Sequence, residues 1–157
     1  MMNKFTNLVF GAAVCVAGTL ALMGPAVADE PPETPTTLTG GKVISVAEAK
    51  KLIDAKAATF VDTRSVVNFG KGHIPGAMTA AYKEKSDKVA AFDPKIDSFE
   101  LDKLPKNKSA AVVFYSDGPT GWKSYKAAVL SISAGYTNVQ YMRGGFADWT
   151  AKGFPVE

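Results

Sequence analysis

An apolar run, a glycine-containing loop and a helix follow one another in AAVVFYSDGPTGWKSYKAA, residues 110–128. The run Ala110–Tyr115 predicts a buried strand, and Ser124–Ser133 predicts a helix that stops at Gly135. In a parallel sheet, ligands bind beyond the carboxyl ends of the strands. The loop between this strand and this helix, Ser116–Lys123, is therefore the first candidate site.

Shorter apolar runs on either side of residues 110–128 predict the rest of a sheet. Strands are expected at Lys42–Ile44, Thr59–Val61, Ala77–Ala81 and Val139–Tyr141, separated by helical stretches or turns. The pattern Ser45-Val46-Ala47-Glu48 is a capping box, which opens a helix that extends to about Ala55. The alternation of strands and helices predicts an α/β domain whose mostly parallel sheet is covered on both faces.

The first 28 residues have the three parts of a secretory signal peptide. Lys4 supplies the positive charge, Leu8–Leu22 the apolar stretch and Ala26–Ala28 a small-x-small cleavage site. The apolar stretch is shorter than the ~20 residues of a membrane span, which argues against an uncleaved anchor. We therefore expect cleavage after Ala28, a periplasmic or secreted location, and no stable membrane insertion afterwards.

The remaining chain divides into a spacer and one domain. Residues 29–41 are rich in Pro, Thr and Glu, which predicts a flexible linker, and residues 42–157 have the length of one domain. The connection Tyr82–Asn107 is long and densely charged, and we expect a helix there followed by a surface excursion. That excursion is either a solvated face or a surface for a lid or a protein partner.

Composition excludes several classes of protein. The one cysteine, Cys15, lies in the predicted signal peptide, so the mature protein has neither a thiol nor a disulfide. With one histidine and no mature cysteine, no metal site and no cofactor are expected. Lys4 is the only charged residue of the signal peptide, so the mature chain carries 17 Lys and Arg against 15 Asp and Glu. That balance does not favour nucleic-acid binding.

Three blocks of sequence, in register, resemble the rhodanese-like domain family. The first combines FVDTRS with GHIPGA, the second is the loop, and the third comprises GYTNV, RGGF and GFPV, at residues 60–65, 72–77, 135–139, 143–146 and 153–156. The resemblance implies a three-layer α/β/α fold with roughly five strands and a thiosulfate sulfurtransferase ancestry. Its signature residues include His73 and Arg143, for which it implies structural places. Asp62 and Arg64, also in the signature, flank the end of a strand, where such a pair more often locks loops by a salt bridge than binds a ligand.

The family's catalytic cysteine has no counterpart in the loop. If the loop is aligned from the preceding strand, Ser116 stands in the place of the cysteine, and if it is aligned from Lys123, Gly118 stands there. In relatives with two cysteines, the two positions correspond to Ser116 and Gly121. None of these residues can form a persulfide, so we expect a pseudoenzyme without sulfur transfer. An enzyme of altered chemistry that uses Ser116 is the alternative, but a serine needs an adjacent base, and the only candidate, His73, belongs to another loop.

The loop without its thiol still predicts an anion-binding site. Glycines let backbone amides turn inward, the following helix contributes a positive end, and Lys123 stands where the family usually has arginine. The candidate ligand-binding residues are Ser116, Asp117, Gly118, Thr120, Gly121, Trp122 and Lys123. We therefore expect a non-catalytic binding module whose partner is a small oxyanion, or a periplasmic protein that docks on residues 82–107. The other alternative is that the loop only keeps the shape of the fold.

Overall fold

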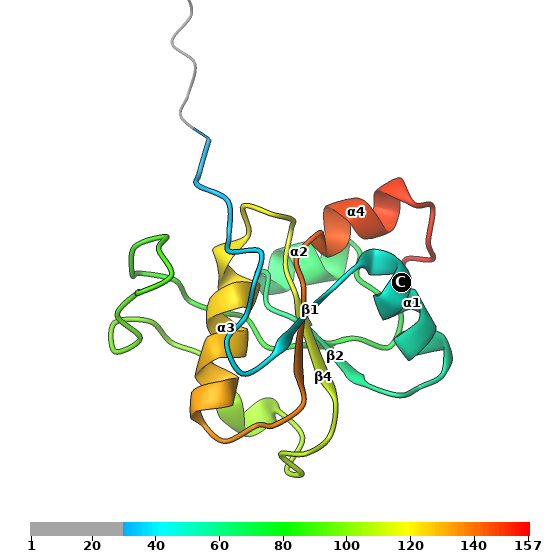
Figure 1. Cartoon of the computed structure of the whole chain (residues 1–157). Helices are drawn as coiled ribbons and strands as arrows, with labels where there is room; N and C mark the ends of the chain where they lie inside the picture. Colours follow the sequence, from blue (N-terminus) through cyan, green and yellow to red (C-terminus); the bar gives the residue numbers. More distant parts are fainter. Residues whose placement is uncertain (1–29) are drawn as a thin grey trace, which may run out of the picture.

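The computed structural model describes residues 30–157, which form one five-stranded parallel sheet with helices on both faces (Figure 1). The expected α/β fold is confirmed. The strand order is β1-β5-β4-β2-β3, with bounds Lys42–Ile44 for β1, Thr59–Asp62 for β2, Met78–Thr79 for β3, Val112–Tyr115 for β4 and Val139–Met142 for β5. The predicted signal peptide, residues 1–28, lies outside the described residues.

Side chains of the central strand β4 alternate between two hydrophobic cores. Val112 and Phe114 pack on the face covered by α3, while Val113 and Tyr115 pack on the opposite face with residues of α1 and α4. All four are fully buried, as expected for a strand in the middle of a covered parallel sheet. The helices are α1 (Val46–Asp54), α2 (Val66–Lys71), α3 (Trp122–Ser133) and α4 (Gly145–Ala151).

Local sequence signals explain how the first and third helices are bounded. The capping box predicted for α1 is present, because Ser45 Oγ accepts from the Glu48 amide and Glu48 Oε2 accepts from the Ser45 amide. Helix α3 begins at Trp122, two residues before the predicted start. It stops before Gly135, whose φ of +94° is the left-handed conformation that favours glycine.

The connection between β3 and β4 differs from the prediction. Residues 82–107 contain no α-helix, only the 3₁₀ turn Leu101–Lys103, and an antiparallel bridge joins Lys83 to Ser98. The expected helix is wrong because polar side chains organise this segment instead. The side chain of Asp97 is buried and accepts hydrogen bonds from the Tyr82 hydroxyl, the Ser86 hydroxyl and the Lys85 and Ser86 amides.

The N-terminal spacer is also not the flexible linker that its composition predicts. Within residues 30–41, Leu38 is buried in the core on the α3 side of the sheet, and Thr34 is only 3% exposed. Thr34 donates a backbone hydrogen bond to the Pro119 carbonyl across 2.8 Å. This segment therefore packs on the domain, next to the candidate loop (Figure 1).

None of the helices in residues 30–157 has the length and apolar character needed to cross a membrane.

Candidate functional site

The candidate loop connects the carboxyl end of β4 to the start of α3, at the strand-end edge of the sheet (Figure 1). Parallel strands bring their carboxyl ends to one edge, so the residues that follow β2 and β5 lie at the same edge as the loop. The structure thus gathers four predicted residues here on three strands: Ser116 after β4, Asp62 and Arg64 at the end of β2, and Arg143 after β5.

Ser116 occupies the interior of the loop. Its side chain donates to the Gly121 carbonyl at 2.9 Å and accepts from Ser124 Oγ at 3.0 Å, and the residue is only 1% exposed. A Cβ atom at position 121 would overlap the Ser116 hydroxyl, which explains the glycine there. The space expected to be an open anion cradle is therefore filled, in part, by two serine hydroxyls.

The outer part of the loop rests on the start of α4. The carbonyls of Ser116 and Asp117 accept from the amides of Phe146 and Ala147 at 2.8 and 2.9 Å. Gly145 has a φ of +62°, and a Cβ there would lie 2.6 Å from the Gly118 amide nitrogen and the Ser116 carbonyl oxygen. Glycine at position 145 is therefore required for the close approach of the two segments.

The remaining loop residues differ in exposure. Asp117 and Thr120 are exposed, and Lys123 is partly exposed. The side chain of Lys123 forms no ion pair and no hydrogen bond with the described residues. Trp122 is buried, stacks edge-on against Tyr125 at 5.7 Å and donates its indole N–H to the Pro32 carbonyl at 2.6 Å. No side chain caps the N-terminus of α3, so its first-turn amides have no side-chain acceptor.

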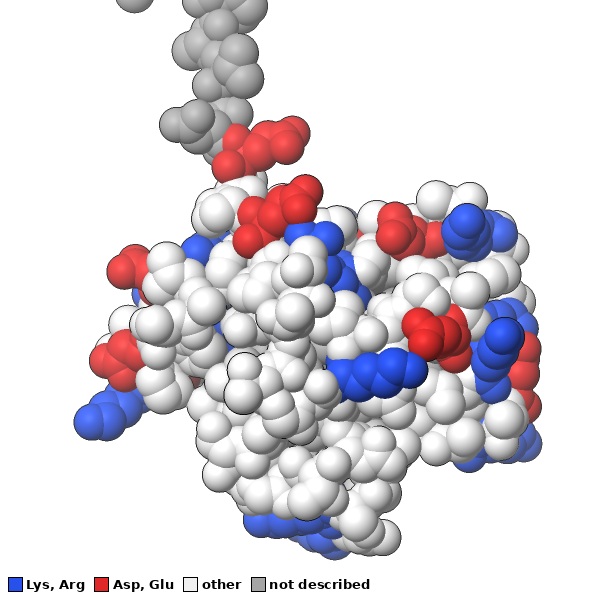
Figure 2. Space-filling view, in the orientation of Figure 1, with Lys and Arg blue, Asp and Glu red and all other residues white. Residues whose placement is uncertain are grey.

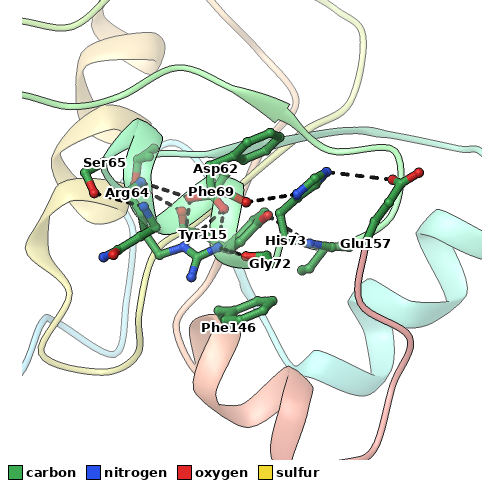
Figure 3. Close-up of polar contacts among 12 residues, drawn as sticks. Asp62, Arg64, Ser65, Phe69, Gly72, His73, Tyr115, Phe146 and Glu157 are labelled. Carbon is green, nitrogen blue, oxygen red and sulfur yellow. Dashed lines mark hydrogen bonds and ion pairs between the residues drawn. The ribbon is translucent and has the colours of Figure 1, made fainter.

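The expected ion pair between Asp62 and Arg64 is present and buried (Figure 3). The guanidinium donates from Nε and Nη2 to both carboxylate oxygens, at 2.7 to 3.1 Å, and from Nη2 to the Gly72 carbonyl at 2.7 Å. Its carbon lies 4.1 Å from the centre of the Phe146 ring. Burial by itself lowers the pKa of Arg64, but the hydrogen bond and charge of Asp62 outweigh it and raise that pKa. Arg64 is thus a fixed charge.

This ion pair adjoins the candidate loop. The same Phe146 that stacks on Arg64 donates its amide to Ser116, and the charge of Asp117 adds to the raised pKa of Arg64. Tyr115, the last residue of β4, accepts from the Ile74 amide through its hydroxyl at 3.2 Å. Burial raises the pKa of Tyr115, so its hydroxyl stays neutral. These contacts connect the loops that follow β2 and β4 to the start of α4.

His73 faces the C-terminus of the chain, and its contacts do not include Ser116 (Figure 3). Its ring stacks on Phe69 at 3.7 Å, Nδ1 lies 3.1 Å from the Phe69 carbonyl and Nε2 lies 3.7 Å from Glu157 Oε2. The backbones of His73 and Glu157 also exchange two hydrogen bonds. His73 is therefore bound to the last residue of the chain, Glu157.

Arg143 contributes to the site through the N-terminal segment. It donates from Nε to the Thr34 carbonyl at 3.1 Å and from Nη2 to Glu33 Oε2 at 2.6 Å. Figure 2 shows acidic and basic side chains next to one another where the described chain begins. Sequence reasoning missed this contact, because a segment rich in Pro, Thr and Glu has the composition of a spacer.

A second polar network was also missed. Lys126 on α3 is fully buried, and its ammonium group lies 2.8 Å from Ser86 Oγ, 3.3 Å from Glu84 Oε2 and 3.9 Å from Asp97 Oδ2. The network attaches residues 82–98 to α3. A charged residue in a helix usually faces solvent, so only the apolar neighbours Ala127 and Ala128 hint that this face is buried.

The described residues include a cavity away from the candidate loop and no cluster of metal ligands. One cavity of about 480 Å³ lies at the opposite edge of the sheet, where β1 and β5 begin, and is lined by Gly40, Lys42, Leu52 and Gln140 among others. Within residues 30–157, no group of three His, Cys, Asp or Glu side chains could hold a metal ion.

The fold and these signature residues define the class of protein. The model of the family described as "Rhodanese-like domain" matches residues 45–152. The chain belongs to this family.

Relatives of the chain include sulfurtransferases. The protein YibN of Escherichia coli (strain K12) is 30% identical over 115 residues, which cover 73% of this chain and 71% of YibN. The human thiosulfate:glutathione sulfurtransferase is 24% identical, over 73% of this chain and 98% of the human protein. The crystal structure of the Alr3790 protein from Anabaena sp. superposes with a TM-score of 0.55 and 26% identity, over 73% of this chain and 80% of that one.

Proposed function

We propose that this protein is an exported rhodanese-like domain that does not carry sulfur and acts as a binding module. One observation supports the proposal above all others. Ser116 follows β4, where the family's sulfur-carrying cysteine is expected, and its hydroxyl is 1% exposed and hydrogen-bonded within the loop. A serine oxygen cannot form a persulfide, and the chain has no cysteine outside the predicted signal peptide.

An enzyme that uses Ser116 as a nucleophile has less support. A serine hydroxyl needs a base that accepts its proton, usually at hydrogen-bond distance. The Ser116 proton is donated to the Gly121 carbonyl, which is not a base, and the one histidine contacts Phe69 and Glu157. The hydroxyl also lacks the exposure that an approaching substrate would require.

The ligand we propose for the loop is a small oxyanion. The uncapped amides at the start of α3 and the partly exposed, unpaired side chain of Lys123 support this choice. The two serine hydroxyls fill the interior of the loop, so the anion would bind at its outer side, near the first turn of α3. Helix-end charge effects of about 0.3 to 1 kcal/mol and charge-assisted hydrogen bonds of about 1.5 to 3 kcal/mol favour millimolar affinity.

Titration of the mature protein with thiosulfate, sulfite, sulfate and phosphate, followed by amide NMR, tests this binding. We expect the amides of Trp122, Lys123 and Ser124 to shift, with half-saturation in the millimolar range and competition by salt. Lys123→Ala should weaken binding severalfold. Lys51→Ala removes an exposed lysine from α1, on the other face of the sheet, and should leave it unchanged.

A titration that moves none of these amides would contradict the oxyanion proposal. The same holds if Lys123→Ala binds as tightly as the parent protein. In either case, a protein that docks on residues 82–107 becomes the better candidate for the ligand of this binding module. Export would place both kinds of ligand in the periplasm or outside the cell.

A further inference from the structure

The segment Pro32–Thr34 is held on the domain by polar contacts that resemble the recognition of a peptide. The Trp122 indole donates to the Pro32 carbonyl at 2.6 Å, the Thr34 amide donates to the Pro119 carbonyl at 2.8 Å, and Arg143 Nε donates to the Thr34 carbonyl at 3.1 Å. These three bonds use only the backbone of the segment. They fix a short stretch of chain regardless of its side chains.

Two side chains of the segment are recognised in addition. The Glu33 carboxylate pairs with Arg143 Nη2 at 2.6 Å. Thr34 Oγ1 donates to the Pro119 carbonyl at 2.8 Å and lies 2.7 Å from the Tyr141 hydroxyl, which is then the donor of that second bond. Burial raises the pKa of Tyr141, which keeps its hydroxyl protonated. The contacts thus select a carboxylate followed directly by a hydroxyl-bearing residue.

Thr34 also contacts the candidate loop directly. Its hydroxyl and its amide both donate to the carbonyl of Pro119, a residue of that loop. Thr34 is only 3% exposed, and Tyr141 beneath its hydroxyl is fully buried. The N-terminal segment is therefore packed against the loop that contains Ser116.

We propose that Pro119, Trp122, Tyr141 and Arg143 form a peptide-binding groove, and that Pro32–Thr34 is its tethered ligand. The groove accepts a peptide in which a carboxylate is followed directly by a threonine. In this chain the ligand is part of the same molecule, because Leu38 anchors the segment in the core four residues further on. An outside peptide of the same chemistry has to displace it. This inference does not depend on the proposed oxyanion.

The tether sets the concentration at which an outside peptide can displace Pro32–Thr34. A short flexible connection gives a tethered ligand an effective concentration in the millimolar range. An untethered peptide therefore competes with Pro32–Thr34 only at millimolar concentration or above. A variant of the full mature chain whose own segment is weakened is a better receptor than the parent protein.

The two tryptophans of the chain allow a test with an internal reference. The Trp122 indole N–H is bonded to Pro32, whereas the Trp149 indole N–H is bonded to the Pro155 carbonyl at 2.7 Å, outside the groove. In the full mature chain, Thr34→Val should speed hydrogen exchange of the Trp122 indole at least tenfold and leave Trp149 unchanged. Thr36→Val is the matched control, since Thr36 is exposed in the same segment.

Addition of an acetylated peptide EPPETPTTL, the sequence of residues 30–38, completes the test. In the Thr34→Val chain it should shift the Trp122 indole resonance and slow its exchange at millimolar concentration. A peptide with valine in place of the first threonine should do neither. Circular dichroism verifies that each variant is folded; if Thr34→Val is not, Glu33→Gln replaces it, because Glu33 belongs to the segment and its side chain is 68% exposed.

Two results would overturn the inference. One is a Trp122 indole that remains as protected in the folded Thr34→Val or Glu33→Gln chain as in the parent, which would mean that the segment is not held by these contacts. The other is a peptide that leaves Trp122 unchanged at several millimolar, which would mean that the groove recognises nothing outside its own chain.

Discussion

Replacement of Lys126 by methionine should destabilise the domain by about 3 kcal/mol. Lys126 is fully buried on α3, and its ammonium group lies 3.3 Å from Glu84 Oε2 and 3.9 Å from Asp97 Oδ2. Methionine keeps most of the length of the side chain but removes its charge. Two acidic side chains, one fully buried and one 13% exposed, would then lack their cation.

The magnitude follows from these separations. With an effective dielectric constant of about 20, unit charges this far apart attract by about 4 to 5 kcal/mol per pair. Burial of the ammonium group costs several kcal/mol, and the methionine variant no longer carries that cost. The net loss of stability is therefore smaller than the lost attraction. Removal of one partner from a buried ion pair typically costs about 3 to 5 kcal/mol. We take the lower end, because Asp97 keeps hydrogen bonds from Tyr82, Lys85 and Ser86.

Urea denaturation followed by far-UV circular dichroism measures the effect as a shift of the midpoint at constant slope. Lys123→Met is the matched control, one helical turn earlier on α3 and partly exposed, and should change the free energy of unfolding by less than about 0.5 kcal/mol. Lys126→Met combined with Glu84→Gln should recover part of the loss. A Lys126→Met protein as stable as the parent, or a Lys123→Met protein equally destabilised, would refute the reasoning.

Three further predictions concern the ion pair, the response to acid and export. Arg64→Lys should lower the free energy of unfolding by about 2 to 3 kcal/mol, because lysine lacks the planar fork that contacts Asp62 and Gly72; a urea midpoint unchanged from the parent would argue against a role in locking the loops. Burial would raise the pKa of Asp97, but hydrogen bonds from Ser86 and Lys85 outweigh it and lower that pKa from 3.8 to about 2. A lowered pKa stabilises the fold above pH 3.8, and this stabilisation, about 2 kcal/mol, is lost as the pH falls toward 2. Asp97→Asn should flatten that part of a stability–pH curve, and a curve as steep as the parent's would show that other groups dominate. Mass spectrometry of the exported protein should find Asp29 as the first residue, whereas a product that retains Met1 in the membrane fraction would indicate an anchor.

The parts of the fold that the sequence predicts are those with local causes. The capping box at Ser45 and Glu48 is a contact between residues three positions apart, and β4 is marked by a continuous apolar run. The stop of α3 at Gly135 depends on the conformation of a single residue. Such signals are contained within a few residues, so they can be found without knowledge of the rest of the structure.

The parts that could not be predicted depend on distant partners. Thr34 is buried because Pro119 and Tyr141 are placed beside it by the sheet, 85 and 107 residues further along the chain. Residues 82–98 lack a helix because Asp97 gathers the surrounding donors and Lys126 fixes the segment to α3. The composition of a Pro- and Thr-rich segment, or of a densely charged one, does not indicate which distant residues will form its hydrogen bonds and ion pairs.

The same limit applies to the candidate site. The loop and the absence of its cysteine can be found from sequence, because both are contained within Ser116–Lys123. That the Ser116 hydroxyl is bonded inside the loop depends on the fold of the turn itself, which brings Gly121 and Ser124 to it. The groove that holds Pro32–Thr34 depends on three separate elements.

The thiosulfate:cyanide sulfurtransferase assay tests the central claim, that this rhodanese-like domain does not transfer sulfur. The mature protein, in metal-free buffer, should form no more thiocyanate than a heat-denatured sample, because no residue of the loop can become a persulfide. Thiocyanate formation well above that control, and abolished by Ser116→Ala, would contradict the claim and show that the loop is catalytic.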